Sequence, residues 1–122
     1  MEKYDTSVWL INTGWTGGPY GVGSRMKLAY TRAMITAALQ GKLEAVDYTT
    51  HPVLGMQIPQ SCSDVPTILL NPEDTWQNPA AYYHQAEELG RAFIENFRQF
   101  ESISSADILW GAPRISNLWP IR

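Results

Sequence analysis

The chain has 122 residues, of which 44% are hydrophobic and 17% are charged. This length allows one small domain, and the composition argues against a disordered chain because it can form an apolar core. The formal net charge of −3 argues against a protein that holds nucleic acid on a large basic face.

Cys62 is the only cysteine, which excludes an intramolecular disulfide and fits a reducing, intracellular setting. The first apolar run, residues 8–11, is far shorter than the roughly 20 residues of a membrane span, and the N-terminal residues do not resemble a signal peptide. We therefore expect a cytoplasmic protein without a membrane or nucleic-acid partner.

The N-terminal half predicts a strand, a glycine-rich loop and a helix, in that order. The run at residues 8–11 is continuously apolar, which is typical of a strand buried on both faces. Five glycines follow within residues 14–23. Residues 31–40 are strong helix formers, and Gly41 stands where a helix commonly ends in a left-handed glycine. Residues 26–30 fit either a loop or a short strand.

The middle of the chain is broken by prolines, which recur every six or seven residues from Pro52 to Pro72 and exclude a long helix. Residues 46–50 and 67–70 are predicted short strands. Asn78 and Pro79 then mark a helix start. The apolar residues that follow recur at helical spacing and predict one core-facing stripe, made of Tyr82, Ala86, Leu89, Phe93, Phe97 and Phe100.

These elements predict an α/β fold, or an α+β fold if the short strands are mainly antiparallel, with a small sheet and a long amphipathic helix near the C-terminus. The tail, residues 101–122, shows no clear period. Its two tryptophans, Trp110 and Trp119, are either buried or form an exposed apolar surface for an interaction.

The glycine-rich loop does not match a phosphate-binding motif. Gly18 and Gly23 have the glycine spacing of G-x-x-x-x-G-K-[ST], but Ser24 and Arg25 follow where that motif requires lysine and then serine or threonine. The dinucleotide pattern fails as well, since Met26 stands in place of its third glycine. From the residues alone, an ordinary connection and an anion-binding loop are equally good interpretations.

Other candidate groups lack a catalytic or metal-binding pattern. Arg25 either pairs with a phosphate or base, or with a nearby carboxylate. His51 and His84 are too far apart for a local metal motif, and we expect them in a loop and on the solvated side of the long helix. Cys62 is expected to be an inert, at least partly buried thiol. We therefore predict no catalytic residue and no metal ligand in this chain.

Three segments, in order, resemble the ATP-dependent phosphoenolpyruvate carboxykinases. They are NTGWTGGPYGVGSRMKLAYTRAMITAAL, the proline-rich stretch HPVLGMQIPQSCSDVPTILLNPEDTW, and the helix AEELGRAFIENFRQF. The resemblance covers roughly residues 7–100. It implies that residues 1–100 are part of the family's C-terminal, mononucleotide-binding domain, and it leaves residues 101–122 as a divergent tail without assignment.

The family converts oxaloacetate and ATP to phosphoenolpyruvate, CO₂ and ADP in gluconeogenesis, using Mg²⁺ and Mn²⁺. The resemblance implies that Arg25, Met26 and Thr31 contact ATP. Ser24 departs from the lysine that is common at its position. The family's phosphate loop, metal ligands and oxaloacetate-binding arginine belong upstream of this segment, so oxaloacetate is a partner only through that part.

We therefore expect a chain that carries adenine-side ATP contacts but has no carboxykinase activity alone. The alternative is a stand-alone nucleotide-binding or protein-interaction module derived from the same domain. A homo-oligomer formed through exposed apolar surface is plausible under either interpretation.

Overall fold

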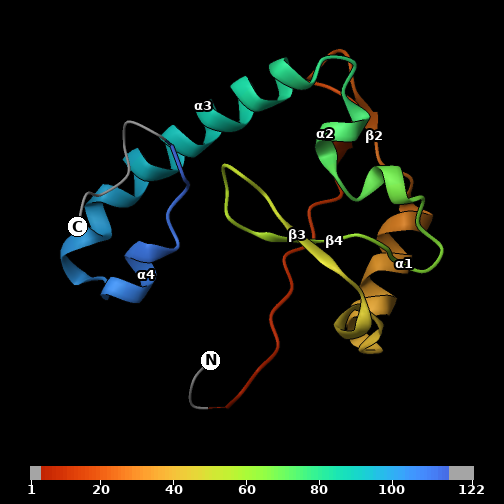
Figure 1. Ribbon diagram of the computed structural model, residues 1–122, viewed down its shortest axis with the longest axis horizontal. Coiled ribbons are helices and arrows are strands. Elements are labelled where there is room, and N and C mark those ends of the chain that lie inside the picture. Colours follow the sequence, from red (N-terminus) through yellow and green to blue (C-terminus); the bar gives the residue numbers. More distant parts are fainter. Residues whose placement is uncertain (1–3, 116–122) are drawn as a thin grey trace.

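The computed structural model describes residues 4–115 of the chain (Figure 1). A long helix arches over one side, a β-hairpin lies beneath its middle, and a second helical unit lies at the far end of that hairpin. In chain order the elements are β1 (Trp15–Thr16), β2 (Ser24–Arg25), α1 (Leu28–Leu39), η1 (Lys42–Ala45), β3 (Tyr48–Thr50), β4 (Gln57–Pro59), η2 (Thr67–Leu69), α2 (Pro72–Thr75), α3 (Pro79–Phe97), η3 (Arg98–Ile103) and α4 (Ala106–Trp110), where η marks a 3₁₀ turn.

The strands form two separate two-stranded ladders, and both are antiparallel. β1 pairs with β2, with Trp15 opposite Arg25, and β3 pairs with β4, with Thr49 opposite Ile58. The expected α/β arrangement is therefore replaced by its α+β alternative. The physical reason is that each pair is joined by a short local connection, which can only reverse the chain direction.

Residues 8–11 are not in a strand, contrary to the prediction. They belong to an extended segment that runs away from the body of the molecule (Figure 1). Val8 and Leu10 are 64% and 77% exposed. A strand needs a hydrogen-bonding neighbour, and the structure places none beside this segment within residues 4–115.

The second incorrect strand prediction is residues 67–70, which form the 3₁₀ turn η2 instead. Pro66 fixes the backbone before this segment, and Leu69 and Leu70 close the turn by hydrogen bonds to Pro66 and Thr67. The other predicted strand, residues 46–50, is confirmed in its last three residues as β3.

Both predicted helices are confirmed. α1 starts three residues earlier than expected, at Leu28, so most of the undecided stretch is helical. It is followed by Gly41 in the left-handed region, at φ 70°. α3 begins at Asn78, whose side chain accepts hydrogen bonds from the Ala80 and Ala81 amides at 3.0 and 3.3 Å.

Two small clusters form the core. The first lies between α1 and the loop before η2, and its buried members are Ala37, Leu43, Cys62 and Val65. The second lies between α3, the β3–β4 connection and the end of the described chain, and its buried members are Val53, Ala86 and Ile115. The chain approaches closely at Gly90, where an added Cβ would lie 2.9 Å from Ile115 Cδ1.

The apolar stripe of α3 is buried only in part, so its interpretation as core packing is wrong for half of it. Ala86 is buried, but Leu89, Phe93 and Phe100 are 44%, 50% and 43% exposed. Within the described residues, too few elements lie under α3 to cover a helix of this length. Trp110 of the tail is 55% exposed, and Trp119 lies outside the described residues.

Candidate functional site

The glycine-rich segment folds into a hairpin, in which β1 and β2 flank a loop at residues 17–23. Gly17, Gly18 and Gly21 have φ angles of 84°, 145° and 89°, which side-chain-bearing residues rarely adopt. At Gly23 an added Cβ would lie 2.5 Å from the Thr16 carbonyl oxygen. These glycines are therefore required by the turn itself.

Several amides of this loop are already hydrogen-bonded within the protein. The Val22 and Gly23 amides both donate to the Pro19 carbonyl at 3.0 Å, and the Gly17 amide donates to Thr75 Oγ1 at 3.2 Å. A phosphate cradle needs a row of free amides. Of the two interpretations that the residues left open, the structure favours the ordinary connection over the anion-binding loop.

The three predicted ATP contacts follow directly on this hairpin. Arg25 ends β2 with an exposed side chain, and Met26 comes next, half-buried, with its amide donating to the Gly14 carbonyl at 3.2 Å. Thr31 lies in the first turn of α1 and is also half-buried. The fold thus places all three where the hairpin meets α1.

Arg25 does not pair with a carboxylate inside the part of the chain that is described. The ion pairs there all lie on α3 or at its end, and join His84 with Glu88, Arg91 with Glu87, and Arg98 with Glu95. The guanidinium of Arg25 therefore remains available to an external anion or a flat ring.

The hairpin is tied to α2 through Thr75. Besides accepting the Gly17 amide, Thr75 Oγ1 donates to the Pro72 carbonyl of its own helix at 2.7 Å. α2 is in turn held against α3, because the Tyr83 hydroxyl donates to Glu73 Oε2 and Trp76 meets the Tyr82 ring edge-on, with ring centroids 5.6 Å apart.

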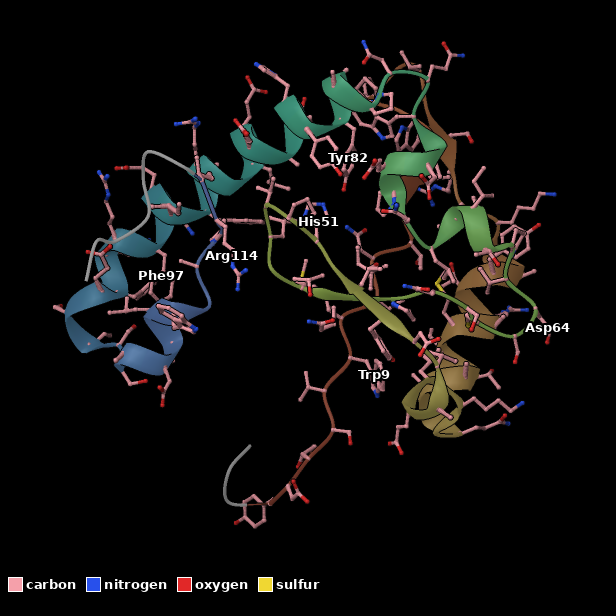
Figure 2. The ribbon with its side chains drawn as sticks, viewed as in Figure 1. Trp9, His51, Asp64, Tyr82, Phe97 and Arg114 are labelled. Atoms are coloured by element: carbon pink, nitrogen blue, oxygen red, sulfur yellow. The ribbon has the colours of Figure 1, made fainter. Side chains whose placement is uncertain are left out.

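His51 is the residue that sequence reasoning missed. It is 4% exposed and lies at the β3–β4 connection, facing Tyr82 of α3 (Figure 2). Its Nδ1 accepts hydrogen bonds from the Val53 and Leu54 amides at 3.2 and 3.0 Å. Because Nδ1 accepts, the proton sits on Nε2, which donates to the Tyr82 hydroxyl at 2.7 Å. Only the position before Pro52, a frequent turn signal, hinted at this role.

The pKa values around this network follow from burial and from Glu73. Burial lowers the pKa of His51, opposed in part by the charge of Glu73. Burial also raises the pKa of Tyr82, with Glu73 adding to it. The hydrogen bond to Glu73 raises the pKa of Tyr83 to about 12. The network is therefore neutral at His51 and both tyrosines near pH 7.

Cys62 and His84 lie where the sequence predicts them. Cys62 is buried, and burial raises the pKa of its thiol, which makes it a poor nucleophile. His84 lies on the exposed side of α3, 3.9 Å from Glu88. Among residues 4–115, no group of three or more His, Cys, Asp or Glu side chains is arranged to hold a metal ion.

Two hollows of the described surface lie away from Arg25. One, of about 860 Å³, is lined by residues that include Val53, Tyr83 and Trp110. The other, of about 810 Å³, is an apolar groove between the end of α3 and α4. Arg25, Met26 and Thr31 line neither of them; Arg25 is exposed, and Met26 and Thr31 are half-buried.

Comparison with known proteins identifies the family. The family model described as phosphoenolpyruvate carboxykinase, in its ATP form, matches residues 1–68, which is more than half of the chain. The chain belongs to the phosphoenolpyruvate carboxykinase family. The match includes the glycine-rich hairpin, α1 and the β3–β4 hairpin.

Individual carboxykinases agree with this over a longer region. The proteins named phosphoenolpyruvate carboxykinase (ATP) from Christiangramia forsetii and Flavobacterium johnsoniae are 55% and 57% identical over 113 residues, which is 93% of this chain and 21% of each relative. The one from Alkaliphilus oremlandii is 51% identical over 104 residues, 85% of this chain and 20% of its own length. An alignment of 113 residues extends beyond Phe100, into the segment that we expected to diverge.

The chain thus spans about a fifth of the length of the curated relatives that it matches. None of the helices in residues 4–115 is both long and apolar enough to cross a membrane.

Proposed function

We propose that this chain forms the adenine-side part of the ATP site in an ATP-dependent phosphoenolpyruvate carboxykinase, within that enzyme's C-terminal nucleotide-binding domain. The observation that supports this proposal is the position of Arg25. Its guanidinium is exposed, forms no ion pair among the described residues, and lies at the end of the glycine-rich hairpin. It lies within the region that matches the family model.

Each proposed contact has a chemical role. The flat guanidinium of Arg25 stacks on the adenine ring or pairs with a phosphate, and the thioether of Met26 adds a polarisable apolar contact. The hydroxyl of Thr31, at the start of α1, donates to or accepts from the nucleoside. None of the three side chains is a general base that could take up a proton near pH 7 or activate the Thr31 hydroxyl, so the role proposed for them is binding and orientation.

The complete reaction breaks the carbon–carbon bond to the leaving carboxyl group of oxaloacetate and transfers the γ-phosphoryl group of ATP to the resulting enolate oxygen. The products are phosphoenolpyruvate, CO₂ and ADP, and the step belongs to gluconeogenesis in the cytoplasm. The family's Mg²⁺ and Mn²⁺ do not fit a cluster among residues 4–115. The proposal assigns the metal and oxaloacetate contacts to the remainder of the enzyme.

Calorimetric titration of the chain with ATP tests this proposal. Saturable binding is expected, and Arg25→Ala should weaken it roughly 3- to 30-fold, the range of one cation–π or comparable charged contact. Arg32→Ala is the matched control, because Arg32 is an exposed cation on α1. Absence of ATP binding, or equal effects of the two substitutions, would refute the proposal. A coupled assay should detect no carboxykinase turnover by the chain alone.

The alternative function, an interaction module, is favoured by the exposed apolar stripe. Leu89 and Phe93, both in that stripe, are 44% and 50% exposed. Under this alternative the chain self-associates through that surface and does not bind ATP. Sedimentation velocity tests this alternative. It predicts that the chain sediments as an oligomer and that Phe93→Ser shifts it toward the monomer, whereas the nucleotide-binding role predicts ATP binding that does not depend on Phe93.

A further inference from the structure

The hairpin that carries Arg25 is too small to hold its own shape. β1 and β2 contribute two residues each, and an isolated two-stranded hairpin is at best marginally stable in water. The stack of Trp15 on Tyr20, with ring centroids 5.9 Å apart, supports it from inside. Its position relative to the rest of the molecule must be fixed by contacts outside the hairpin.

One hydrogen bond provides such a contact. The Gly17 amide donates to Thr75 Oγ1, which lies 58 positions later in the chain. Among the hydrogen bonds of residues 4–115, no other links the glycine-rich hairpin to an element that follows α1. Gly17 directly follows Thr16, which pairs with Ser24, the residue before Arg25. The tether is therefore attached one residue away from the ladder that holds Arg25.

Thr75 suits this task because a hydroxyl can donate and accept at once. It donates to Pro72 within α2, which fixes the side-chain rotamer, and its lone pairs then point to Gly17. The branched Cβ restricts the rotamer further. α2 is itself held in place against α3. Glu73 accepts a hydrogen bond from the Tyr83 hydroxyl, and Trp76, the residue after α2, packs on the ring of Tyr82.

We propose that Thr75 is a positioning residue for the nucleotide contact at Arg25. It fixes the glycine-rich hairpin against α2, and through α2 against α3, so that the guanidinium is held in one place before ATP binds. This inference rests on the proposed ATP-binding function. It assigns a share of the affinity to α2, which is not among the proposed ATP contacts.

The test compares Thr75→Val, which keeps the shape and removes the hydroxyl, with Thr75→Ser, which keeps the hydroxyl. Calorimetry should show ATP binding about 2- to 10-fold weaker in T75V, as expected for loss of the neutral hydrogen bond to Gly17, and near wild type in T75S. T75V also removes the bond to the Pro72 carbonyl, which lies within α2. The matched control is Thr49→Val, because Thr49 is an exposed threonine on β3. It should leave the affinity unchanged.

Two further readouts separate positioning from a general loss of structure. Hydrogen exchange of the Met26 amide, which closes the hairpin onto Gly14, should accelerate in T75V and recover in T75S. The hydrogen bond to Glu73 raises the pKa of Tyr83, and this raised pKa should be the same in all three variants as in wild type, showing that α2 still lies on α3.

The possible outcomes distinguish failure of the positioning role of Thr75 from failure of the proposed ATP-binding function. If wild type binds ATP and T75V binds equally well, or if T75S is as weak as T75V, the positioning role is wrong while the ATP site stands. If the wild-type chain does not bind ATP, or Arg25→Ala has no effect, the proposed function fails and this inference fails with it.

Discussion

The buried imidazole of His51 makes the stability of the chain depend on pH. Its Nδ1 accepts from two backbone amides, and protonation would place a third hydrogen where the Val53 and Leu54 amides already point. The folded state therefore favours the neutral ring, and burial lowers its pKa. In the unfolded chain the ring titrates near its ordinary pKa of 6.5. The free energy of unfolding should be constant well above that pH and fall as the pH drops below it.

The change in the free energy of unfolding is limited, because only one proton is bound. A single group changes the free energy of unfolding by at most about 1.4 kcal/mol per pH unit. At pH 5.5, one unit below the unfolded pKa, the loss relative to pH 7.5 is then up to about 1.4 kcal/mol, and it grows until the pH reaches the folded pKa. Against the roughly 5–15 kcal/mol that stabilise a typical domain, this change is measurable.

His51→Asn isolates this contribution. An asparagine oxygen can accept from the amide two residues on, as in an Asx turn, so the local turn survives. The variant loses the bond to Tyr82 and should be about 1–2 kcal/mol less stable at pH 7.5. Urea unfolding at pH 7.5, 6.5 and 5.5 should show that this difference narrows as the pH falls, since the variant cannot be protonated.

His84→Asn is the control, because His84 is exposed on α3 and its loss should leave the pH dependence in place. If the difference between wild type and H51N is the same at all three pH values, the imidazole is not held neutral by the fold. The reasoning from its hydrogen bonds would then be refuted.

Two further substitutions test the local structure. Gly23→Ala should destabilise the closed hairpin by about 1–3 kcal/mol, because the added Cβ would lie 2.5 Å from the Thr16 carbonyl oxygen. The loss of stability should appear as faster hydrogen exchange of the Met26 amide. Gly14→Ala is its control, since an added Cβ there meets nothing within 4 Å, and equal exchange in both variants would contradict the prediction. Asn78→Ala should cost about 1 kcal/mol in urea unfolding through loss of the α3 cap, and no loss of stability would contradict this.

Signals that act through neighbouring backbone atoms predicted the structure well. Asn78 caps α3 through amides two and three residues away, and Gly41 follows α1 in the left-handed conformation. These residues act within a single turn, so a short stretch of sequence is enough to predict what they do. The two predicted helices, α1 and α3, therefore appear where the sequence places them, and only their ends shift.

The candidate site was predictable only as a location. The order of glycines, Arg25 and Thr31 predicted a loop followed by a helix, and the structure has a hairpin followed by α1. The contacts that hold the hairpin were not predictable, because Gly17 and Thr75 are 58 positions apart. The same is true of His51, whose partner Tyr82 lies 31 positions away. Such pairs are set by the tertiary fold, and no local pattern marks them.

Burial is the property that a local pattern predicts least well in this chain. Residues 8–11 and the stripe of α3 both have the composition of buried segments, yet Leu10 is 77% exposed and Phe93 is 50% exposed. A cap or a turn is complete once its own few residues are in place, whereas an apolar face is buried only when another element covers it. The carboxykinases that the chain matches are more than four times its length, since 113 matched residues are 21% of each. The exposure of both segments follows from the same rule that predicted their burial, because the elements among residues 4–115 leave much of both apolar faces uncovered.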